Sequence, residues 1–229
     1  MRNYPVVMSV VALMLSSCSA KVELPTDLVE KAATCAVVSA AEARSTMKDV
    51  DKPLPFERQS QIIHYALLAG AGDPKFSREN ANHVVRRMQT LQEMFADDEW
   101  VPLVAPCNAA FPQASPGYAV TLPADPAEAQ LTCYALGDFM SRALSAYEET
   151  YGDKLIQYDS FLTRLKPIVA AEAPKGAGKR AADSAQMAKR SAALAVAAKL
   201  GPPAKVMDAC LQRFPDDAKA TKKGATGKV

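Results

Sequence analysis

The side chains with the most obvious capacity for chemistry in this 229-residue chain are its two histidines. His64 and His83 both lie in segments expected to be helical, and Glu79 precedes His83 by four residues, on the same helix face. A histidine with neighbouring acids can bind a metal ion or activate water, so one interpretation is a metal-dependent or other hydrolytic enzyme. A surface ion pair explains the Glu79 spacing equally well, and both histidines can lie on solvated faces. No metal or other cofactor is therefore assigned.

The first twenty residues have the layout of an export signal. Arg2 gives a positive start, and Val6 to Leu15 form a nearly unbroken apolar run, shorter than the roughly 20 residues that span a bilayer. The run ends in Leu15-Ser16-Ser17-Cys18, which resembles the lipobox of bacterial lipoproteins. The resemblance implies a signal peptide over residues 1–17, cleavage before Cys18, and acylation of Cys18 with palmitate-like chains.

The same resemblance implies a location in the cell envelope. Ser19 follows the acylated Cys, where many lipoproteins of the inner membrane carry Asp. We therefore expect a lipid anchor in the outer membrane with the protein facing the periplasm, because two or three acyl chains hold a protein firmly. The alternative is ordinary cleavage after Ala20, which would produce a soluble periplasmic or secreted protein.

The four remaining cysteines indicate two disulfide bonds. Cys35, Cys107, Cys133 and Cys210 form an even set in an exported chain, and such sets are usually oxidised. There is no CxxC pair, no CxxCH haem signature and no zinc-like spacing with histidine in the sequence. Four cysteines allow three pairings, and their spacing alone does not choose among them.

An internal duplication chooses the pairing. Residues 22–35 and 120–133 align without a gap and are identical at seven of fourteen positions, and Cys107 and Cys210 each begin a CxxxFP motif. Equivalent positions should have equivalent partners. We therefore predict bonds from Cys35 to Cys107 and from Cys133 to Cys210, and we expect each half to depend on its own bond.

The repeated start has a local structural meaning. Asp27 and Asp125 are placed as helix N-caps, and Glu30 and Glu128 follow three residues later, as in a capping box. The apolar residues beyond each start recur at helical rather than strand spacing. Three apolar stripes are expected in the second half: Cys133, Leu136, Met140, Ala143, Leu144 and Tyr147; Tyr158, Phe161, Leu162, Leu165, Ile168 and Val169; Ala181, Ala185, Ala188, Ala192 and Ala195.

These features predict an all-α fold made of two tandem helical repeats. Each repeat should contain about three long helices and one short helix, closed by one disulfide. We place repeat 1 at 18–115, repeat 2 at 116–215, and a disordered Lys-rich tail at 216–229.

The sequence favours a non-enzymatic binding or interaction module over an enzyme. The net charge is +2, so nucleic acid is not an expected partner. The membrane is one expected partner, through the anchor, and an envelope protein or peptide is another. A basic group around the third helix of repeat 2 could contact an acidic partner or anionic lipid, although a solvated polar face is the preferred interpretation: Lys175, Lys179, Arg180, Lys189 and Arg190.

Overall fold

The structure is a computed structural model, described over residues 23–72, 75–93, 99–171 and 179–215. Within these ranges every regular element is a helix, so the predicted all-α class is confirmed. The expected signal peptide, Cys18 and the Lys-rich tail lie outside the described residues. The helices are α1 (Leu28–Ser45), α2 (Phe56–Gly70), α3 (Arg78–Gln92), α4 (Val104–Ala110), α5 (Pro126–Ala143), α6 (Glu148–Ala171), α7 (Lys179–Lys199) and α8 (Pro203–Arg213), with 3-10 turns η1 (Val101–Leu103), η2 (Pro112–Ala114) and η3 (Ser145–Tyr147).

The two matched aspartates begin α1 and α5, as predicted. Asp27 Oδ1 accepts hydrogen bonds from the amides of Val29 and Glu30, each at 3.0 Å, and Asp125 Oδ1 accepts one from the amide of Glu128 at 2.7 Å. The capping box also predicts that the carboxylate of Glu30 accepts a hydrogen bond from the backbone amide of Asp27, and this prediction is wrong. The Glu30 carboxylate instead accepts a 2.8 Å bond from Nε of Arg87 on α3, because an opposite charge on a neighbouring helix competes with the local amide.

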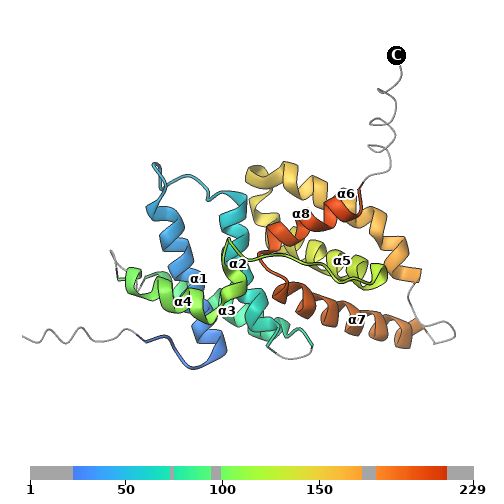
Figure 1. Ribbon diagram of the computed structural model, residues 1–229, viewed down its shortest axis with the longest axis horizontal. Coiled ribbons are helices and arrows are strands. Elements are labelled where there is room, and N and C mark those ends of the chain that lie inside the picture. The colour runs from blue at the N-terminus through green and yellow to red at the C-terminus, as the bar shows by residue number, and fades with distance from the viewer. Residues whose placement is uncertain (1–22, 73–74, 94–98, 172–178, 216–229) are drawn as a thin grey trace, which may run out of the picture.

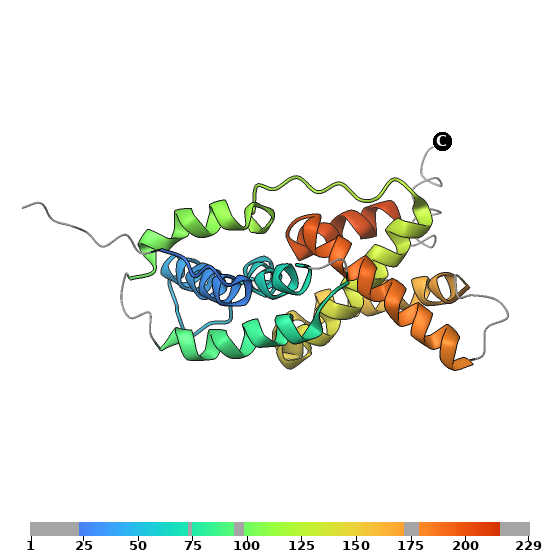
Figure 2. The ribbon, with the colours of Figure 1, turned by 90° about the horizontal axis from the view of Figure 1, so that it is seen from below.

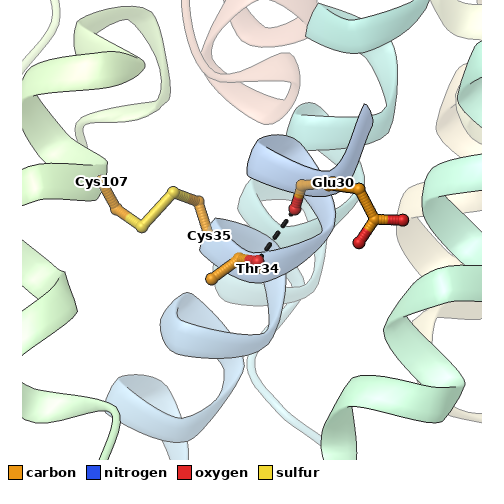
Figure 3. The surroundings of a disulfide bond; sticks show 4 residues. All are labelled: Glu30, Thr34, Cys35 and Cys107. Atoms are coloured by element: carbon orange, nitrogen blue, oxygen red, sulfur yellow. Dashed lines mark hydrogen bonds between the residues drawn. A yellow bond between two sulfur atoms is a disulfide. The ribbon is translucent and has the colours of Figure 1, made fainter. Parts of the chain in front are cut away.

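Two buried disulfides link α4 to α1 and α8 to α5. Cys35 of α1 is bonded to Cys107 of α4 (Figure 3), and Cys133 of α5 is bonded to Cys210 of α8. These are the pairs expected from the duplication. Beside the first bond, Thr34 Oγ1 donates to the carbonyl oxygen of Glu30 at 2.9 Å (Figure 3), which satisfies a polar side chain that is buried in α1.

The helices form two groups that lie side by side, with α1 to α4 on one side and α5 to α8 on the other (Figures 1 and 2). Helix α2 occupies the centre, since it packs against α1 and α3 of its own half and against α7 and α8 of the other. Eleven of its fifteen residues are buried. Helix α6, in contrast, buries only one stripe of residues along one face. The buried hydrophobic residues of both halves form one continuous core.

All three predicted apolar stripes of the second half differ in part from the buried faces. In the α7 stripe Ala195 is buried as expected and Ala185 is half-buried, but Ala181, Ala188 and Ala192 are exposed. Ala193 and Ala197, outside the predicted stripe, are buried. Alanine occurs on every face of this helix, so periodicity could not identify the side that would meet α5 and α2.

In the stripe of the fifth helix, Cys133, Leu136, Met140 and Leu144 are buried as expected. Helix α5 ends at Ala143, which is exposed, and Tyr147 lies on η3 with 43% of its surface exposed. In the α6 stripe Ile168 is likewise exposed. None of the described helices combines the length and apolar character needed to cross a membrane.

Candidate functional site

An open groove of about 1030 Å³ lies between the two halves of the molecule. Helices α1, α2 and α3 contribute one side, and α5, η3 and α7 contribute the other. Its volume is at the upper end of the range for small-ligand sites. The groove is therefore large enough to receive part of another molecule.

One wall of the groove is a complete face of α3. Its lining residues recur every three or four positions, from the first residue of the helix to the last: Arg78, Ala81, Asn82, Val85, Met88, Gln89 and Gln92. At about 1.5 Å per residue this face is about 21 Å long. Half of the surface of Val85 is exposed, so an apolar side chain stands open to solvent in the middle of the wall.

The floor and the opposite wall are largely apolar. Ile62 and Ala66 of α2 are buried beneath the groove, and Phe139 of α5 and Leu194 of α7 line the far side. Phe76, just before α3, packs edge to face on Phe139 with the ring centroids 6.1 Å apart. This ring pair joins the two halves within the groove.

Arginines on four different helices surround this apolar surface: Arg44 of α1, Arg78 of α3, Arg142 of α5 and Arg190 of α7. Among the residues that the structure describes, the single acidic lining residue is Asp138, which forms an ion pair with Arg142. No carboxylate in the described ranges forms an ion pair with Arg44, Arg78 or Arg190. The groove therefore carries a local excess of positive charge.

Two of these arginines are held in place by other contacts. Arg44 Nη1 donates to the carbonyl oxygen of Val50 at 2.6 Å. The guanidinium of Arg190 lies over the ring of Tyr134, 4.8 Å from its centroid, as in a cation–π contact. Arg78 is exposed at the start of α3. Its charge is therefore accessible from solvent at the end of the groove wall.

The two histidines do not form a site together. The interpretation that both histidines can lie on solvated faces does not hold for His64. This residue is fully buried in α2, and its Nε2 lies 2.7 Å from the carbonyl oxygen of Ala198 on α7. His83 is exposed on α3, as expected. Neither histidine is among the groove-lining residues. Within the described part of the chain, no three His, Cys, Asp or Glu side chains are grouped closely enough to hold a metal ion.

The burial of His64 determines the protonation state of its imidazole. Removal from water lowers the pKa of its imidazole to about 4, and the hydrogen bond to Ala198 opposes this effect only in part. A carbonyl oxygen can only accept, so Nε2 carries the proton, and Nδ1 is buried without a hydrogen-bond partner. The imidazole is therefore neutral near pH 7 and acts as a structural donor.

Sequence reasoning identified one lining residue of the groove, Arg190, as part of a possible acidic-partner surface. The other arginines were missed because they are far apart in the chain and on separate helices. One sequence signal for the groove was available on α3. Val85 is an apolar residue that lies outside the buried stripe of Val84 and Leu91, so it indicated a second apolar face on this helix.

No protein-family model matches the chain, and no curated protein or solved structure matches it significantly. The function is therefore argued from the geometry of the groove.

Proposed function

We propose that this protein is a non-enzymatic binding module of the bacterial envelope, and that the groove between its halves is the binding site. The observation that carries the proposal is the open apolar surface in the groove. Val85 is 50% exposed and Met187 is 66% exposed, on opposite walls. Apolar side chains gathered in a concave surface are typical of a site for another molecule.

The proposed location is the outer membrane, facing the periplasm, with Cys18 as the lipid anchor. The lipobox-like residues before Cys18 support this location, and the two disulfides are consistent with an oxidising compartment. The binding groove would then be presented to periplasmic proteins or peptides close to the membrane.

The alternative of a hydrolytic enzyme has less support from the geometry. It requires His64 and His83 to share a concave site with neighbouring acids. His64 is buried against Ala198, whereas His83 is exposed on a different helix.

We also propose that the two halves are tandem repeats. In the described residues each half contains four α-helices, with a disulfide between the first and the fourth. The helix that carries the second cysteine of each bond ends at a Phe of similar backbone geometry, with φ −131° and ψ 65° at Phe111 and φ −122° and ψ 68° at Phe214. Both Phe amides donate at 2.9 Å to the carbonyl oxygen of the bonded cysteine. The groove would then lie at the junction of two diverged copies.

Site-specific photo-crosslinking in intact cells tests the proposed binding site. A photoreactive amino acid replaces Val85 in the groove or, as a matched control, the exposed apolar Ile156 on α6, which does not line the groove. We expect a discrete adduct from position 85 and none from position 156. Absence of an adduct at 85, or the same adducts from both positions, would contradict the proposal.

A further inference from the structure

The shape of the groove indicates an elongated occupant. The lining face of α3 extends over the whole helix, from Arg78 to Gln92, about 21 Å. Four lining residues of α7, from Met187 to Leu194, are also spaced at three and four positions. Two helical faces that line the same groove can pack against a third helix of about 14 residues, as in helix-in-groove recognition.

The residues on the walls suit a helical apolar stripe. Met88 and Met187 contribute flexible side chains from α3 and α7, and Val85, Phe139 and Leu194 contribute fixed apolar surface. Methionines adapt their shape to the side chains that they meet. Four amide side chains accompany this surface and can bond to the polar flanks of a peptide: Gln59, Asn82, Gln89 and Gln92.

The charge of the groove indicates an acidic occupant. Over the whole chain 27 basic residues nearly balance 25 acidic ones. The described lining of the groove, in contrast, contains four arginines and one aspartate. A guanidinium binds a carboxylate through two parallel hydrogen bonds, with the charge of both groups adding to the attraction. Like charge argues against the Lys-rich residues 216–229 of this chain as the occupant.

The placement of the arginines distinguishes a peptide from a lipid. They come from four helices, so the positive charge is distributed around the groove. A fatty acid offers one carboxylate at one end, and its hydrocarbon chain cannot form hydrogen bonds with the Asn and Gln side chains of α3. An amphipathic helix can offer several carboxylates along its flanks.

Resting on the function proposed above, we infer that the groove binds an acidic amphipathic helix of about 14 residues, supplied by a partner protein. The apolar face of this helix would contact Val85, Met88 and Leu194, and its carboxylates would bind the surrounding arginines.

Two synthetic helical peptides of 14 residues test this inference on the purified full-length protein in detergent. Both carry Leu at positions spaced by three and four, and they carry either Glu or Lys on the flanks. Fluorescence anisotropy should show binding of the Glu peptide and at least about tenfold weaker binding of the Lys peptide, as expected for charge-assisted contacts.

Arg78→Glu and Arg86→Glu form a matched pair of variants. Both arginines are exposed on α3, but only Arg78 lines the groove. We expect Arg78→Glu to weaken binding of the Glu peptide by at least about tenfold and to strengthen binding of the Lys peptide, whereas Arg86→Glu should change either affinity by less than about twofold.

Three results would overturn the inference: no binding of the Glu peptide, equal binding of both peptides, or equal effects of the two substitutions. A fluorescent C16 fatty acid provides a further comparison. Its binding in the groove, with exclusion of the Glu peptide, would identify a lipid occupant and overturn the peptide assignment. In that case an adduct at position 85 would still support the binding module itself, so the two proposals fail separately.

Discussion

Ser60 and His64 lie one turn apart on α2 and together hold the connection between α7 and α8. The imidazole donates to the carbonyl of Ala198 at 2.7 Å, and Ser60 Oγ accepts from the amide of Ala204 at 3.1 Å. Terminal helix groups of this kind have no partner within their own helix. Gly201 turns the chain between them with a φ of 132°, which favours glycine. Two polar side chains of the first half thus satisfy the backbone of the second.

The first prediction is that stability decreases on acidification because of His64. In the unfolded chain its pKa is near 6.5, whereas burial lowers the folded pKa to about 4. Between these values the unfolded chain binds a proton that the folded protein does not. The stabilising contribution of the neutral imidazole is complete above pH 6.5 and is lost as the pH falls through the folded pKa. By pH 4 and below, this loss amounts to roughly 3 kcal/mol of the free energy of unfolding.

Urea unfolding at pH 7.5, 5.5 and 4 measures this dependence. In His64→Gln, which keeps an N–H donor but does not titrate, the decrease in free energy of unfolding should be smaller than in the wild type. His83→Gln is the control and should keep the wild-type profile. Identical profiles for His64→Gln and the wild type would contradict the assignment.

The second prediction separates the two histidines at neutral pH. His64→Ala leaves the Ala198 carbonyl without its donor and opens a cavity, so we expect a loss of about 2–4 kcal/mol. His83→Ala removes an exposed side chain and should change stability by less than about 0.5 kcal/mol. Chemical denaturation measures both, and the photo-adduct at position 85 should persist in His83→Ala. Loss of that adduct with the fold intact would favour the enzyme hypothesis.

The third prediction concerns the disulfides. The sequence alone predicts that each half depends on its own bond. The continuous core, with α2 packed on α7 and α8, leads to a different expectation. Replacing Cys35 and Cys107 by Ser should lower the global stability by about 2–5 kcal/mol and reduce hydrogen-exchange protection in α7 as well as in α1. The Cys133→Ser/Cys210→Ser variant is the matched control and should affect α2 in turn. Unchanged protection of α5 to α8 in the first variant would show that the halves are independent.

The fourth prediction concerns the N-caps. Asp27→Ala and Asp125→Ala should each reduce the free energy of unfolding by about 1 kcal/mol, because each removes an acceptor of terminal amides. Asn retains an acceptor oxygen, so Asp27→Asn should lose less. Equal losses for the Ala and Asn variants in denaturation experiments would show that capping is not the cause.

The fifth prediction is that Cys18 becomes the acylated first residue of the mature protein. Mass spectrometry of the mature N-terminus measures this directly. Cys18→Ala should abolish acylation and release the protein from the membrane fraction. An unmodified chain that starts at Lys21 would instead support ordinary signal cleavage.

The features that could be predicted from the sequence alone are mostly those that depend on residues close together in the chain. The helical class follows from apolar spacing, and the capping aspartates act on amides two and three residues away. The disulfide pairing followed from the duplication, in which Cys35 and Cys133 occupy equivalent positions. The tertiary structure decided the features that depend on partners distant in the chain. It buried His64 against Ala198, directed Glu30 to Arg87, and selected the buried face of α7. The groove belongs to this second group, because its walls are helices whose residues meet only after the two halves have packed.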